Sequence, residues 1–138
     1  MPSRSRSRQR ALQILFSWDT LRQPVDEAID AYFSTLYSEE RPERDAFAAE
    51  LVRGAVRNAA EIDARIAKHA EHWRVERMPA VDRNILRLAV FEMTGEKTPA
   101  PVVIDEAIEL ARKFSSEESA QFVNGVLDAI HREGAAGE

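Results

Sequence analysis

The sequence of 138 residues lacks cysteine, has only five glycines and contains no long apolar run. The absence of cysteine excludes a disulfide-held fold, a thiolate nucleophile and a Cys-ligated metal site. The glycines are scattered, so no glycine-rich loop is available to cradle a phosphate. No run approaches the roughly 18 apolar residues of a membrane span, and no apolar stretch follows the basic start as in a signal peptide. We therefore expect a cytoplasmic protein without a membrane segment and without a cofactor.

The apolar residues that are present suffice for one compact core. They make up 44% of the chain, and a domain of about 100–150 residues buries about two-thirds of the surface that its unfolded chain exposes. Their spacing is helical nearly everywhere. Helices are predicted over about 5–22, 25–36, 43–58, 61–72, 79–93, 102–114 and 115–132. Breaks are predicted at Pro24, over 38–42 and over the loop 97–101.

This pattern predicts an all-α fold of about seven helices. A basic arm over 1–10 would precede one helical domain over 11–132, with subdomains over about 11–58 and 61–132, and a frayed tail would cover 133–138. The fifth helix is apolar on most sides, as in a central, buried helix. Gly54 in the third helix would be tolerated if a neighbouring helix packs closely there. Ser115 and Glu118 have the spacing of a capping box at the start of the last helix.

Charge is distributed unevenly along the chain. The formal net charge is −5, yet the first ten residues hold four arginines and no acid, whereas residues 11–138 hold 15 basic and 24 acidic side chains, a net charge of −9. The four arginines are Arg4, Arg6, Arg8 and Arg10. A basic arm on an acidic body indicates a polyanionic partner that the arm reaches, although a tail without a role would have the same composition.

The arm by itself would bind RNA weakly. Four phosphate contacts to a single strand give a slope of log affinity against log salt of only about −3. Whether the arm extends the first helix or orders only on binding is left open by the residues. In either case it would need an aromatic platform or a second protein to reach a useful affinity.

No combination of residues indicates an active site or a metal site. His69 and His72 are spaced to share a metal, with Glu76 one turn further, but such a site needs three or four ligands and His131 belongs to another predicted helix. The acids between residues 105 and 109 are interpreted as helix-dipole partners and solvated surface. We therefore expect no metal and no enzymatic activity.

The segment from Gln121 to Gly125 is unusual for a core helix. Asn124 and Gly125 are poor helix formers, and Phe122 lies off the apolar stripe. One interpretation is an exposed ring for base stacking, beside amides that bind base edges. The other is that Gly125 marks a close helix crossing while Asn124 bonds a loop, and the residues alone favour neither.

Four segments together resemble the NusB family of transcription antitermination factors. They are RQRALQILFSW at 8–18, VDRNILRLAVFE at 81–92, VIDEAIELARKF at 103–114 and FVNGVLD at 122–128. The match covers about residues 8–130 in order, with the loop 97–101 in place. The family usually has Asn where this chain has Asp105, a change that we expect to leave the fold intact.

The resemblance implies two small helical bundles and no enzymatic activity. Proteins similar to this one bind the boxA element of nascent ribosomal RNA leaders together with NusE, a small-subunit ribosomal protein. The pair helps assemble an RNA polymerase complex that reads through terminators and supports rRNA transcription. The family's RNA-binding surface maps onto Arg4, Arg6, Arg8, Arg10, Gln121, Phe122 and Asn124, with Glu118 at its edge. Its NusE-facing surface maps onto Phe16, Glu76 and Asp82.

Other possibilities remain at this point. Some family members self-associate through the RNA-binding surface, so a homodimer is possible. A helical protein-binding adaptor with an idle arm is one alternative function. Another is the RNA-binding module of an rRNA methyltransferase, which would require a further domain with a glycine-rich cofactor loop.

Overall fold

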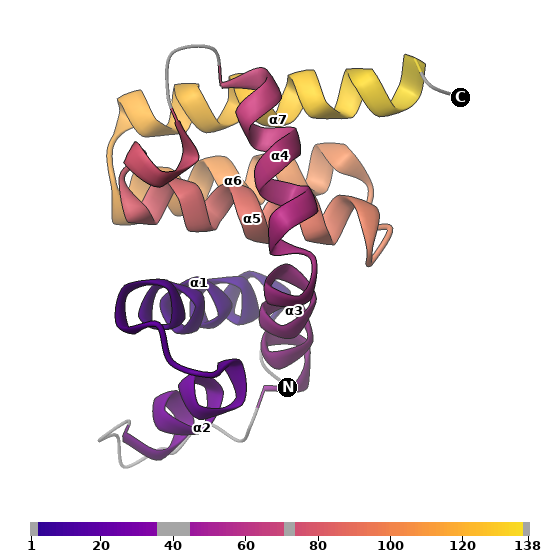
Figure 1. Ribbon diagram of the computed structural model, residues 1–138. Helices are drawn as coiled ribbons and strands as arrows, with labels where there is room; N and C mark the ends of the chain where they lie inside the picture. The colour runs from indigo at the N-terminus through magenta and orange to yellow at the C-terminus, as the bar shows by residue number, and fades with distance from the viewer. Residues whose placement is uncertain (1–2, 36–44, 71–73, 137–138) are drawn as a thin grey trace.

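A computed structural model describes residues 3–35, 45–70 and 74–136 (Figure 1). Over these ranges the chain forms seven α-helices and one turn of 3-10 helix, and no strand. The elements are α1 (Arg4–Leu21), α2 (Val25–Thr35), α3 (Ala46–Arg57), α4 (Ala59–His69), η1 (Val75–Arg77), α5 (Ala80–Thr94), α6 (Ala100–Phe114) and α7 (Glu117–Ala136). The predicted all-α fold is confirmed. None of these helices is long and apolar enough to cross a membrane.

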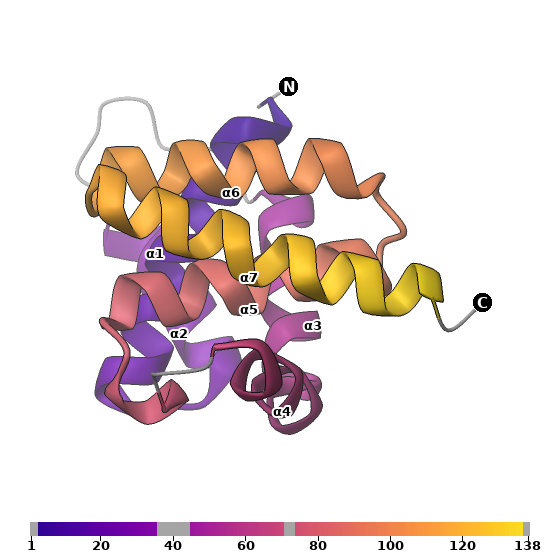
Figure 2. The same cartoon turned by 90° about the horizontal axis from the view of Figure 1, so that it is seen from above.

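The helices lie in two stacked groups, with α1 to α3 in one and α4 to α7 in the other (Figure 1; Figure 2 is the view from above). Helix α5 lies at the junction, because it contacts α1 and α3 on one side and α6 and α7 on the other. Every residue from Ile85 to Val90 is buried. The prediction of a central, buried fifth helix is therefore confirmed.

The N-terminal arginines belong to the first helix, whereas the last helix is longer than predicted. Helix α1 begins at Arg4, where the Ser3 hydroxyl accepts a hydrogen bond from the backbone N–H of Arg6 at 3.1 Å. Residues 4–10 are thus the first two turns of α1, which agrees with the predicted start near residue 5, and the basic segment extends this helix. Helix α7 continues to Ala136, so residues 133–136 are helical where a frayed tail was predicted.

Local capping explains the shifts of other helix ends. Helix α3 begins after Asp45, whose carboxylate accepts from the Ala48 N–H at 3.0 Å. Helix α6 begins two residues earlier than predicted, since Pro101 falls in its first turn, where a missing N–H costs no hydrogen bond. In α7 the capping hydroxyl belongs to Ser116, which accepts from the Ser119 N–H at 3.0 Å, and not to Ser115. The predicted break over 38–42 lies outside the described residues.

Gly54 lies where α3 packs against α5, as expected for a tolerated mid-helix glycine. A Cβ atom at residue 54 would lie 2.0 Å from Cζ of Phe91. A Cβ at Gly95 would lie 2.3 Å from Cε1 of the same ring. The Phe91 ring is therefore held between two glycines, and the close packing predicted at Gly54 is confirmed.

Candidate nucleic-acid interface

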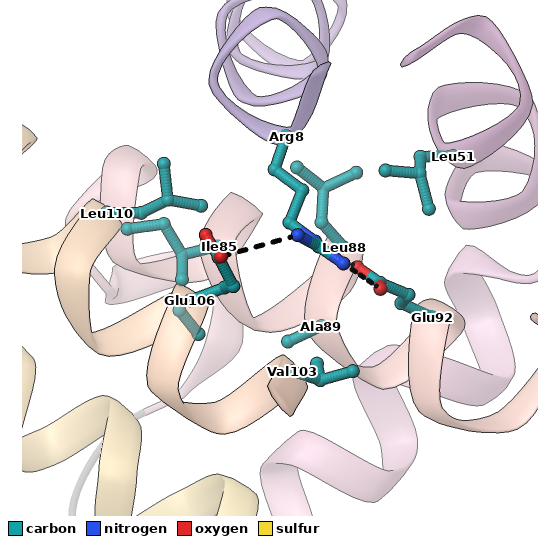
Figure 3. A pocket seen from close by; sticks show the side chains of 10 residues that line it. Arg8, Leu51, Ile85, Leu88, Ala89, Glu92, Val103, Glu106 and Leu110 are labelled. Carbon is teal, nitrogen blue, oxygen red and sulfur yellow. Dashed lines mark hydrogen bonds and ion pairs between the residues drawn. The ribbon is translucent and has the colours of Figure 1, made fainter. Parts of the chain in front are cut away.

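Arg8 points into the protein, between α1, α5 and α6 (Figure 3). Its Nε and Nη2 donate to the two carboxylate oxygens of Glu92 at 2.7 and 2.6 Å, and Nη1 lies 3.6 Å from Glu106 Oε1. The hydrogen bond with Glu92 raises the pKa of Arg8 despite its burial. The cavity around this group is only about 10 Å³, room for about one water. The geometry does not meet the expectation that Arg8 contacts RNA, because its guanidinium is already bound within the core.

Arg10 is also tied to the protein. Its Nη1 lies 3.1 Å from Asp45 Oδ2, and the Ser7 hydroxyl donates to the same oxygen at 2.6 Å. Burial opposes ionisation of Asp45, but the hydrogen bonds from Ser7, the Ala48 N–H and Arg10 lower its pKa. The ion pair of Arg10 with Asp45 thus joins α1 to the start of α3. A ligand could bind only those hydrogen-bond donors of Arg10 that this ion pair does not use.

Arg4 and Arg6 are the exposed members of the group. The Arg4 guanidinium carbon lies 4.3 Å from the centroid of the Phe47 ring, a cation–π contact that leaves the charge near the surface. Within the described residues, the side chains of these arginines contact Tyr32 of α2, α3 and its cap, α5 and α6, and no contact with α7 is found. The structure therefore does not bring the arginines together with Phe122.

The first half of α7 has one buried and one exposed face. Its buried residues are Ser119, Ala120, Val123, Val126 and Leu127. Gln121, Asn124 and Gly125 are exposed, and Phe122 is half-buried. No heavy atom lies within 4 Å of the place that a Gly125 Cβ would take, so this glycine marks no helix crossing. In a helix interior it costs about 1 kcal/mol relative to alanine.

A pocket of about 370 Å³ lies beside Phe122. It is lined by Met78, Pro79, Asp82, Ser115, Ser116, Glu118, Ser119 and Phe122. Asp82 is 4% exposed, and its Oδ2 accepts from the Ser119 hydroxyl at 2.9 Å. Its Oδ1 is buried without a hydrogen-bond partner among the described residues. A buried carboxylate oxygen is costly to leave unpaired, and Oδ1 has almost no surface that solvent or a ligand could reach.

A second pocket, of about 350 Å³, lies on the α1 side. It is lined by Leu12, Gln13, Phe16, Ser17, Val81 and Phe114. Phe16 is 37% exposed, which is unusual for a ring in an apolar pocket. Val81 directly precedes Asp82 and Phe114 directly precedes Ser115, so residues that are adjacent in sequence line the two pockets.

The three residues predicted to face a protein partner are not brought together. Phe16 lines the apolar pocket, whereas Asp82 is buried in the pocket of Phe122. Glu76 is exposed in η1 and lines a third pocket, together with Asp19 and Arg83. Phe16 and Glu76 are thus exposed, whereas Asp82 is buried.

The sequence did not reveal a network of buried charges at the end of α1. Arg87, 8% exposed, donates to both oxygens of Asp63 at 2.8 Å. Arg83 lies 2.7 Å from Asp19, whose pKa is lowered by hydrogen bonds from Arg83 and Asn84 although burial opposes this. These groups join α1, α4 and α5, and their pairing indicates a structural role.

The histidines do not assemble a metal site in the described parts of the chain. No group of three His, Cys, Asp or Glu side chains there could hold an ion. His69 of α4 is hydrogen-bonded to Glu133 of α7. His72 lies outside the described residues.

Comparison with known proteins places the whole helical region in one family. The model of the NusB family matches residues 5–132. A transcription antitermination protein NusB from Solibacter usitatus is 72% identical over 133 residues, covering 96% of this chain and 91% of that protein. The one from Koribacter versatilis is 51% identical, covering 95% of this chain and 90% of the relative. A crystal structure of the antitermination factors NusB and NusE in complex with dsRNA has a TM-score of 0.83 at 31% identity, covering 94% of this chain and 96% of the matched chain.

Proposed function

Because this chain belongs to the NusB family, we propose that it binds single-stranded, boxA-type RNA of ribosomal leader transcripts together with NusE. In this role it acts as a transcription antitermination factor within an RNA polymerase complex in the cytoplasm. It would work by binding and not by catalysis. The relatives that it resembles are transcription antitermination proteins.

The observation that carries the RNA proposal is the pocket beside Phe122. A half-buried ring offers a face on which a base can stack, and stacking contributes about 1–3 kcal/mol per base. The exposed carboxylate of Glu118, which lines the same pocket, can accept from an amino or imino group of that base. Both contacts need a base that is free of a duplex, which favours a single strand.

The charges of this chain require a basic partner. With only Arg4 and Arg6 exposed, the arm supplies about two phosphate contacts, and the expected salt slope falls to about −1.4. Residues 11–138 carry a net charge of −9, which repels RNA and attracts a basic protein. The apolar pocket around Phe16 is the proposed NusE site, and it is separate from the Phe122 pocket, so that both ligands could bind together.

The test is the affinity for boxA-type and scrambled RNA, measured at matched salt with and without NusE. We expect the binary complex to bind boxA-type RNA much more tightly than this chain alone. Phe122→Ala should weaken RNA binding by about 1–3 kcal/mol and leave NusE binding unchanged. Phe16→Ala should weaken NusE binding and remove the gain that NusE provides.

Three results would contradict the proposal. Equal RNA affinity with and without NusE would remove the role of the partner. Melting of the protein by Phe122→Ala would show that the ring is part of the core. If the protein bound NusE but showed no preference for boxA-type RNA, its function would be that of a helical protein-binding adaptor. The apolar pocket around Phe16 by itself supports only that function.

A further inference from the structure

Lys113, near the end of α6, is bonded to the helix that carries the N-terminal arginines. Helix α6 crosses α1 (Figure 2), and two side-chain hydrogen bonds join the helices there. The Ser5 hydroxyl donates to Glu106 Oε1 at 2.7 Å. One turn further along α1, Gln9 Oε1 accepts from the Lys113 ammonium at 3.1 Å. We name Gln9 and Lys113 the α1–α6 bridge.

The charge of Lys113 is not neutralised by any carboxylate within residues 3–35, 45–70 and 74–136. Its ammonium is bonded to the neutral amide of Gln9 and lies 5.6 Å from the centroid of the Phe114 ring. Glu106 and Glu109, the nearest acids before it on α6, are bound by arginines instead. Since an ammonium has three donors and Lys113 is exposed, it keeps both charge and donors for a ligand.

The bridge lies between two surfaces that the arginines alone leave separate. Arg6 precedes Gln9 by three positions, so their side chains are neighbours on the surface of α1. Ser115, two residues after Lys113, lines the pocket beside Phe122. The α1–α6 bridge therefore connects the exposed arginines of α1 with the edge of that pocket.

We propose that Lys113 binds a phosphate of the RNA strand between the exposed arginines of α1 and the pocket beside Phe122. This inference rests on the function proposed above and adds a contact on α6 to those of the arginines. A phosphate is the expected ligand, because an ammonium attracts an oxyanion as a point charge and does not select a base. Gln9 holds the ammonium in place without cancelling its charge. With three phosphate contacts the expected salt slope becomes about −2.1, compared with about −1.4 for the two exposed arginines alone.

Two neighbouring cations of α6 provide a matched test. Lys113 and Arg112 are both exposed, but Arg112 donates to Glu117 at 2.8 Å and to Glu109 at 2.9 Å. Lys113→Gln and Arg112→Gln change the net charge equally, so they differ only in whether the lost cation was already paired.

Filter binding to boxA-type RNA over a salt series measures the contact. Lys113→Gln should reduce the magnitude of the salt slope by about 0.7, and its loss of affinity should be about threefold larger at 50 mM than at 200 mM salt. Arg112→Gln should keep the wild-type slope, and Lys113→Arg should keep it as well because the charge remains. Gln9→Glu should act like Lys113→Gln, since a carboxylate there would pair with the ammonium.

The outcomes separate this inference from the proposed function. If the wild type does not bind RNA, the proposed function fails and the inference fails with it. If the wild type binds RNA and Lys113→Gln keeps its slope, or Arg112→Gln loses as much slope, the phosphate contact is wrong while the proposed function stands. A loss of NusE binding in Lys113→Gln would assign this lysine to the protein partner. A fall in its melting temperature by more than about 5 °C would show a structural role. Either result would overturn the phosphate contact.

Discussion

Replacing Arg8 by alanine distinguishes a structural arginine from one that binds RNA. The Arg8 and Glu92 side chains are 8% and 3% exposed, and two short hydrogen bonds join them. Alanine would leave the Glu92 carboxylate buried, without its cation and close to Glu106. Removing one member of a buried pair costs about 3–5 kcal/mol. That is a large part of the 5–15 kcal/mol of a typical domain, and it corresponds to a fall in melting temperature of about 10–20 °C.

Thermal unfolding followed by circular dichroism measures this effect. Arg6→Ala is the matched control, because Arg6 is exposed on the same helix and its loss should change stability by less than about 0.5 kcal/mol. The double variant Arg8→Met with Glu92→Leu should recover most of the lost stability, since apolar groups of similar volume often replace a buried ion pair without loss. If Arg8→Ala melted like the wild type but lost RNA binding, our assignment of Arg8 to the core would be refuted.

Three further predictions concern charge and packing. Removing Arg4 and Arg6 together should reduce the magnitude of the salt slope of RNA binding by about 1.4, and an unchanged slope in filter binding would exclude phosphate contacts. Gly54→Ala should cost about 1–3 kcal/mol in urea unfolding, because the new Cβ would lie 2.0 Å from Cζ of Phe91 and would force that ring to shift; wild-type stability would show that the ring relocates without cost. Hydrogen bonds from Lys68 and His69 of α4 lower the pKa of Glu133 from 4.5 to about 2. The ionised carboxylate therefore stabilises the fold above pH 4.5, and this contribution disappears as the pH falls through 2. The melting temperatures of Glu133→Gln and the wild type should therefore differ at pH 6 and converge by pH 2, whereas a constant difference would contradict this assignment.

The helices could be predicted from the sequence because their information is local. Apolar residues recur at helical spacing in every element, and the breaks at Pro24 and over 97–101 separate them as expected. The tight packing at Gly54 was also predictable, since a glycine inside an amphipathic helix suggests a close neighbour. The remaining errors at helix ends came from single capping groups, such as the Ser116 hydroxyl.

The burial of charged side chains could not be predicted in this way. Arg8 lies in an arginine-rich segment, which suggests an exposed arm. The carboxylate that binds its guanidinium belongs to Glu92, 84 positions further along the chain. Asp82 is likewise bonded to a serine 37 positions away. Whether a charge lies inside or outside depends on such long-range pairs. The half-buried ring of Phe122 and the exposure of Gln121 and Asn124 were closer to the prediction, because they follow from the periodicity of one helix.

The pair of Arg8 and Glu92 also bears on how the protein is made. Translation proceeds at about 5–20 residues per second, so the 84 positions between the two side chains correspond to roughly 4–17 s. During that interval Arg8 has been synthesised but its carboxylate partner has not. Since α5 packs against α1 and α3, we expect the N-terminal half of the nascent chain to become stable only after α5 has been made.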